Sequence, residues 1–198
     1  MARNTRAALG FKVHIGWTAV VAVGGPPDEP QILAKTRIDV ATTFDEGAVF
    51  HGGQEMPIDD ARAFIETSEK RFIERARAGL ADFVKVLDAK IIAAGMAADA
   101  ARKLPPFESI LKSHPLVHAA EGELYRRVFA EAAAALGVKP TRVPAKTLAA
   151  STAEALGTTP AKLDARLAAL GKASGRPWAA DQKQATLAAW LVLLGRRA

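Results

Sequence analysis

A helix predicted over about residues 115–137 carries side chains that could hold a metal ion. At about 100° per residue, one side of this helix presents His114, His118, Glu121 and Tyr125, and the opposite side presents Glu123. Two imidazoles four residues apart, followed by a carboxylate, could bind a divalent metal. The alternative is a polar helix edge whose histidines bond to their neighbours. The sequence favours this alternative, because strong zinc helices carry a third ligand and a catalytic glutamate at fixed spacing.

The positive charge of the chain is concentrated in its last third. The formal net charge is +6, and residues 139–198 hold ten Lys and Arg against three Asp and Glu. A one-sided basic surface suits a polyanion, usually a nucleic acid, whereas a basic surface kept for solubility is the alternative. The candidate nucleic-acid contacts are Arg142, Lys146, Lys162, Arg166, Lys172, Arg176 and Lys183. Both DNA and RNA fit this prediction.

Part of this basic region also has the pattern of a helix-turn-helix. In residues 147–170, Lys162 and Arg166 could face a groove of DNA. An ordinary helical hairpin is the favoured interpretation.

Length and composition limit the class of protein. The 198 residues, 49% of them hydrophobic, suit one folded domain, with residues 1–6 expected to be disordered. Without cysteine, disulfides and thiolate chemistry are excluded. No apolar run is long enough to cross a bilayer and no signal-peptide core is present, so we expect a cytoplasmic protein without a membrane partner. A homodimer is compatible with the sequence.

The order of predicted elements indicates an α/β fold. Residues 8–23 read as one long strand or two joined strands, and a turn at 24–30 leads to an antiparallel strand at 31–42. The apolar run at 90–98 predicts a buried central strand. Helices are predicted at 58–88, 144–156, 160–170 and 180–194, with a short strand at 141–143 and a loop at 43–57. The loop contains His51-Gly52-Gly53 and reads as a plain connector, although such a segment could also lie over a site.

Several local features resemble the RNase H-like superfamily, and within it the RuvC-type Holliday-junction resolvases. The opening strand pair, with Leu9-Gly10-Phe11 and the run at 16–21, is similar to that of the family, and Gly122 falls where the family's helix has a glycine. The segment at 145–170 resembles the family's helix pair, and Asp181 followed by ATLAAW resembles its terminal helix. The resemblance implies a mixed sheet with antiparallel first strands, flanked by helices.

The resemblance also implies a metal site that this chain has mostly lost. In the family, carboxylates on the opening strand, the central strand and the terminal helix hold two metal ions for phosphodiester hydrolysis. Here Lys12 stands where the resemblance places the first aspartate, the central strand has no carboxylate, and Asp181 remains. A lysine ammonium would repel a metal ion rather than bind it.

These observations lead to three alternative functions. The favoured one is a catalytically degraded RuvC-like domain that binds nucleic acid or another partner. The second is a metal-dependent nuclease with a relocated site, formed by Glu108, His114, His118, Glu121 and Asp181, in which Glu121 and Asp181 are the catalytic candidates. The third is a non-enzymatic scaffold or oligomerisation protein. A divalent metal is the one cofactor that the sequence suggests, and its ligands would be His114, His118 and Glu121.

Overall fold

Five strands form a single mixed sheet in the computed structural model, which describes residues 5–195. The strands are β1 (Thr5–His14), β2 (Trp17–Gly24), β3 (Gln31–Asp39), β4 (Ala89–Ala97) and β5 (Pro140–Val143). Their order is β3-β2-β1-β4-β5; β2 is antiparallel to both β1 and β3, whereas β4 is parallel to β1 and to β5. The predicted mixed sheet with antiparallel first strands is therefore confirmed, and residues 8–23 form two strands.

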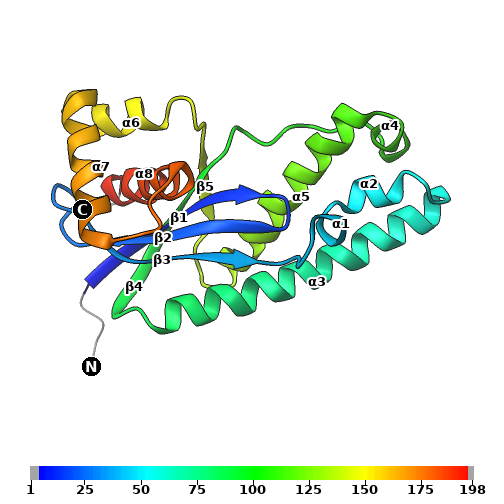
Figure 1. The fold of residues 1–198 in the computed structure, drawn as a ribbon, viewed down its shortest axis with the longest axis horizontal. Coiled ribbons are helices and arrows are strands. Elements are labelled where there is room, and N and C mark those ends of the chain that lie inside the picture. The colour runs from blue at the N-terminus through cyan, green and yellow to red at the C-terminus, as the bar shows by residue number, and fades with distance from the viewer. Residues whose placement is uncertain (1–4, 196–198) are drawn as a thin grey trace.

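Helices cover both faces of this sheet. They are α1 (Phe44–Gly47), α2 (Val49–Gly53), α3 (Ile58–Lys85), α4 (Phe107–Leu111), α5 (His114–Ala134), α6 (Leu148–Ala155), α7 (Pro160–Ser174) and α8 (Ala180–Leu194). The long helices α3 and α5 pack on one face and α8 packs on the other. Figure 1 shows α6 and α7 gathered beside α8 at one end of the molecule, and α1, α2 and α4 at the opposite end. Within the described residues, no helix combines the length and hydropathy that a bilayer span requires.

The alternation of side chains along β1 separates the two layers. Leu9 and Phe11 are fully buried in the core shared with α3 and α5. The intervening residues face α8, and there the sequence places glycine: a Cβ on Gly10 would lie 1.8 Å from the carbonyl oxygen of Ala185. Gly95 on β4 has the same role, because its Cβ would lie 2.2 Å from the carbonyl oxygen of Ala188. The backbone of α8 therefore rests directly on β1 and β4.

Several predicted boundaries are wrong. The predicted loop at 43–57 contains α1 and α2, and Thr43 caps α1 by accepting a hydrogen bond from the main-chain N–H of Glu46. The helix predicted from 144 begins at Leu148, and the helix predicted to end at 170 continues to Ser174. Thr5 begins β1, so the disorder predicted for residues 1–6 does not extend to it, and residues 1–4 lie outside the described part of the chain.

The close approach of α8 predicts the effect of adding one methyl group to the sheet. We expect Gly95→Ala to lower the free energy of unfolding by at least about 1–3 kcal/mol, because its Cβ would collide with main-chain atoms that cannot rotate away. Chemical denaturation followed by circular dichroism measures this change. Gly52→Ala is the matched control, since a Cβ there meets only a side chain at 3.5 Å, and its stability should be unchanged or slightly higher. Equal stability of the Gly95→Ala protein and the parent would contradict this packing.

Candidate functional site

The end of β1 lies against the first turn of α8. Nε2 of His14, the last residue of β1, is 3.0 Å from Oδ1 of Asp181, and both side chains are about one-third exposed. The close packing of Ala185 on Gly10 fixes this contact, because Asp181 precedes Ala185 by about one helical turn. Asp181 therefore has a fixed place at the strand end, where its carboxylate is paired with an imidazole.

Aromatic and cationic side chains surround this pair on the same face of the sheet. His14 stacks on Trp17, its partner across the β-hairpin, with ring centroids 4.2 Å apart and planes inclined by 11°. The guanidinium of Arg37 lies 4.0 Å from the Trp17 ring centroid, and Arg37 also binds Asp39. Strand alternation places Lys12 on the face that Gly10 and His14 share. Asp39 pairs directly with Trp17 across β2 and β3, so it lies on this face too. We call Lys12, His14, Trp17, Arg37, Asp39 and Asp181 the strand-end face.

The neighbouring strand contributes no carboxylate to the strand-end face. Gly95 faces α8, so alternation puts Ala97, the last residue of β4, on the same side, and Ala97 packs into the small core around α8. The first acidic residue after β4 is Asp99, which is exposed. Among the described residues, neither Asp99 nor Asp181 belongs to a group of three metal-capable side chains with converging ligand atoms.

Three of the four histidines converge elsewhere, between α2 and the start of α5. Ligand atoms of His51, His114 and His118 all lie within 4.8 Å of one another, and Nε2 of His114 is 3.0 Å from Nε2 of His118. The imidazole rings meet edge to face, with centroids separated by 4.4–5.2 Å. The two α5 histidines are exposed and His51 is half-buried. We call these three residues the histidine cluster.

Glu121 binds His51 of the histidine cluster on the side that faces the protein interior. Its carboxylate is fully buried, and both oxygens lie 3.0 Å from Nδ1 of His51. Oε1 also accepts hydrogen bonds from the main-chain N–H groups of Phe50 and His51, at 3.2 and 3.3 Å. These N–H groups belong to the first turn of α2, which lacks acceptors within the helix. Glu121 thus caps α2 and orients His51, rather than standing beside His114 and His118 as the sequence suggested.

Two further contacts hold the segment that carries His51. The hydroxyl of Tyr125 donates to the carbonyl of Gly47 at 2.7 Å, and burial, together with the nearby Glu121, raises the pKa of that hydroxyl. Oε1 of Glu46 accepts from Nη1 of Arg75 on α3 at 2.6 Å. The path from α1 to α2 is therefore fixed from both α5 and α3.

The remaining carboxylates of the predicted sites are engaged in ion pairs. Burial alone would raise the pKa of Glu123, but hydrogen bonds from Arg142 and Arg126 outweigh it and lower the pKa. The guanidinium of Arg126 packs over Gly122, where a Cβ would lie 2.9 Å from Nη2. The missing side chain of Gly122 therefore makes room for Arg126. Glu108 lies 3.5 Å from Arg62 on an exposed surface.

Most of the predicted nucleic-acid contacts are exposed. The exposed residues of this set are Lys146, Lys162, Arg166, Lys172, Arg176 and Lys183. Arg142 differs, because its guanidinium is half-buried and bound to Glu123 at 2.9 Å. The region at 147–170 forms two helices, with Leu148 on α6 and Leu163 and Leu167 on α7 buried in the core around α8. These contacts do not distinguish a helical hairpin from a helix-turn-helix.

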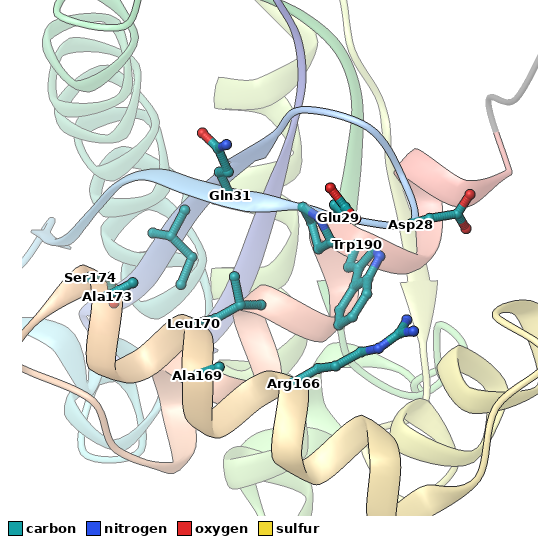
Figure 2. A pocket seen from close by; sticks show the side chains of 11 residues that line it. Asp28, Glu29, Gln31, Arg166, Ala169, Leu170, Ala173, Ser174 and Trp190 are labelled. Carbon is teal, nitrogen blue, oxygen red and sulfur yellow. The ribbon is translucent and has the colours of Figure 1, made fainter.

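A cavity of about 660 Å³ lies at the other end of the strands. Gln31 lines it and pairs with Gly24, which itself pairs with Ala7 near the start of β1. Figure 2 shows Trp190 between the turn that carries Asp28 and Glu29 and the side chain of Arg166. The cavity is therefore separate from the strand-end face.

Comparisons with known proteins define the fold. No family model matches the sequence, and no curated protein matches it either. A structure of Thermus thermophilus RuvC in complex with a Holliday junction substrate aligns with a TM-score of 0.58 and 10% identity, covering 97% of this chain and 95% of that one. A second Thermus thermophilus RuvC structure aligns with a TM-score of 0.52, 11% identity and 96% and 95% coverage. The chain has the RuvC fold.

Within the RuvC-like fold, the side chains at the strand ends do not fit a pair of Mg²⁺ ions. Such ions take oxygen ligands from several carboxylates. The strand-end face offers Asp181, already paired with His14, and Asp39, already paired with Arg37. The ends of the two parallel strands carry Lys12 and Ala97, which offer no carboxylate. No step of phosphodiester hydrolysis through two metals follows from these residues.

Sequence reasoning missed two histidines. His14 and Asp181 are 167 positions apart, and His51 and Glu121 are 70 apart, so no local spacing connects them. The one available signal for His51 is its position in a glycine-containing connector, a kind of segment that could lie over a site.

The hydrogen bonds of Glu46 on α1 predict a contribution to stability that is lost in acid. Hydrogen bonds from the main-chain N–H and the hydroxyl of Thr42, assisted by Arg75, lower the pKa of Glu46 from 4.5 to about 2. Because the folded state holds this carboxylate ionised, its contribution is complete above about pH 4.5 and is lost as pH falls toward 2. Glu46→Gln should therefore melt below the parent at pH 7, and the difference should close toward pH 2.

Thermal melts at a series of pH values measure this difference. Glu55→Gln, which removes an exposed carboxylate from the loop after α2, is the matched control and should follow the parent at every pH. A Glu46→Gln difference that stays constant from pH 7 to pH 2 would contradict the assignment.

Proposed function

We propose that this RuvC-like domain binds nucleic acid across the strand-end face and does not hydrolyse it with two metal ions there. The observation that carries the proposal is the composition of that face. Lys12, Arg37 and the half-exposed Trp17 lie together beside two carboxylates, and both are already paired, Asp181 with His14 and Asp39 with Arg37. Cations with an interleaved aromatic ring suit phosphates and bases.

The charges nearby support a polyanionic ligand. Lys183 is exposed in the first turn of α8 and adds a positive charge to the start of that helix. The first turn of α8 lies at this region, because its Asp181 contacts His14, and the N-terminus of a helix favours anions. Lys35, one alternation before Arg37 on β3, is engaged instead: its ammonium donates to Ser174 at the end of α7, and burial lowers its pKa.

The likeness to a RuvC structure determined with a Holliday junction suggests which nucleic acid to test. That protein is similar to this chain over almost its whole length, and the proposal takes from it a four-way DNA junction as the first ligand. Arg166 on α7 lines the cavity at the opposite end of the strands, so the proposed contact at the strand-end face does not depend on it.

The relocated nuclease site has less support. It requires Asp181 to join the histidines of α5, but the carboxylate of Asp181 lies 3.0 Å from His14. Glu108 is 3.5 Å from Arg62 on the surface. The proposal therefore keeps nucleic-acid binding and treats nuclease activity as an outcome that would overturn its second part.

Binding through phosphates predicts a strong dependence on salt. We expect the affinity for a four-way junction to fall with salt concentration, with a log–log slope of about −0.9 for each phosphate neutralised. Fluorescence anisotropy with a labelled junction at several salt concentrations gives the slope. Lys12→Ala should weaken binding and reduce the slope by about one.

Lys85→Ala is the matched control for Lys12→Ala. It removes the same charge from an exposed position at the end of α3, a helix that covers the other face of the sheet. Equal effects of the two variants would show a non-specific charge effect and contradict the proposed face. Absence of binding at low salt to junction, duplex and single-stranded DNA and to RNA would favour the scaffold alternative.

The small number of carboxylates at the strand ends predicts that the protein does not cleave DNA with Mg²⁺. We expect no Mg²⁺-dependent cleavage of a four-way junction under conditions where the protein binds it, because Lys12 and Ala97 at the strand ends offer no carboxylate and Asp181 is paired with His14. Denaturing electrophoresis of end-labelled strands detects any product. Cleavage by the parent that disappears in Asp181→Asn would overturn this part of the proposal, whereas cleavage that persists in Asp181→Asn would indicate a contaminant.

A further inference from the structure

We propose that the histidine cluster binds one transition-metal ion, with Zn²⁺ as the expected occupant and a water molecule in the fourth position. The ligands would be His51 from α2 and His114 and His118 from α5. This site is independent of nucleic-acid binding, since its residues lie on elements that flank the sheet on the side away from α8.

The spacing of the ligand atoms fits a zinc ion. With Zn–N bonds of about 2.0–2.1 Å, tetrahedral ligands lie about 3.3 Å apart. Nε2 of His114 and Nε2 of His118 are already 3.0 Å apart, and the third imidazole has an atom within 4.8 Å of both. Small side-chain rotations of the two exposed α5 histidines would bring all three nitrogens to the metal.

Glu121 determines which nitrogen of His51 is available. The buried carboxylate holds Nδ1, so Nδ1 carries the proton and the lone pair lies on Nε2, on the far side of the ring. A carboxylate behind a ligating imidazole is the usual support of a zinc histidine, because it fixes the tautomer and the ring orientation. Glu121 is thus a positioning residue, and its capping hydrogen bonds to α2 fix it in turn.

The donor set indicates the class of metal. Three neutral imidazoles suit Zn²⁺, Cu²⁺, Ni²⁺ or Co²⁺ rather than Mg²⁺ or Ca²⁺, which take oxygen ligands. Structural zinc sites are closed by four protein ligands, whereas a site with three protein ligands keeps one position for water. The exposure of His114 and His118 leaves that position open to solvent.

The chain provides its own control for metal binding. It has four histidines and no cysteine, and the fourth histidine, His14, is paired with Asp181 outside the cluster. Isothermal titration of tag-free protein with Zn²⁺ should give one ion per chain for the parent and for His14→Ala. His51→Ala and His118→Ala should each weaken Zn²⁺ binding. The loss should exceed the about 10–100-fold that is expected when a supporting carboxylate is removed.

Thermal melts separate ligation from folding. Zn²⁺ should raise the melting temperature of the parent and of His14→Ala, because a ligand that binds only the folded state stabilises it. It should not raise that of His118→Ala, whose exposed side chain can be removed without opening the core. Glu121→Gln keeps an acceptor for His51 and should bind Zn²⁺ about 10–100-fold more weakly, with a smaller zinc-induced shift. A purely structural glutamate would lower the melting temperature equally with and without zinc.

Substitution with Co²⁺ reports the geometry of the same site. The parent should show the intense visible bands of four-coordinate Co²⁺, and His118→Ala should lose them. Absence of zinc binding by the parent, binding that survives in both His51→Ala and His118→Ala, or an equal loss in His14→Ala would each overturn the proposal. Junction affinity measured on the same His118→Ala protein should equal that of the parent, which keeps this test separate from the nucleic-acid proposal.

Discussion

The direct contact of α8 with the sheet is the constraint on which the rest of the structure depends. It requires glycine at positions 10 and 95, because any larger side chain would meet the backbone of α8. Once α8 rests on β1 and β4, its first turn must lie over the ends of these strands, and Asp181 reaches His14. The hairpin of α6 and α7 then packs on the outer side of α8, where Leu148, Leu163 and Trp190 form a second core. The close contact of the α8 backbone with β1 and β4 therefore positions both the strand-end face and the helices α6 and α7.

The same architecture can support different chemistry at the strand ends. In the resolvase family that the sequence resembles, carboxylates from two strands and the terminal helix would meet at this place. Here the ends of the two parallel strands carry Lys12 and Ala97, neither of which offers a carboxylate to Mg²⁺. Attraction for phosphates does not require metal ligands, because it depends on positive charge. Nucleic-acid binding and hydrolysis therefore have separate requirements within one fold.

The sequence predicts the fold better than the sites. The turn at 24–30, the alternation at 31–42 and the apolar run at 90–98 are local patterns, and they suffice for the antiparallel first strands and for a buried strand at 90–98, whereas the order of the strands depends on tertiary packing. The helix α2 was missed because two of its five residues are glycine and its cap is supplied by Glu121, 70 positions further along the chain than His51. The same long-range contact brings His51 to the helix that carries His114 and His118. Helical spacing identified those two histidines as neighbours, but only the tertiary structure shows that the third partner is an imidazole and that Glu121 stands behind it.

The most direct test of the central claim is a map of where nucleic acid contacts the protein. Amide chemical shifts of the ¹⁵N-labelled protein, recorded during titration with a short DNA duplex, provide it residue by residue. The account predicts that the perturbed amides gather at residues 12–17, at the end of β3 and in the first turn of α8, with α3 and the histidine cluster unaffected. Perturbations confined to α3 or the histidine cluster, or no perturbation at low salt, would contradict the proposed role of the strand-end face.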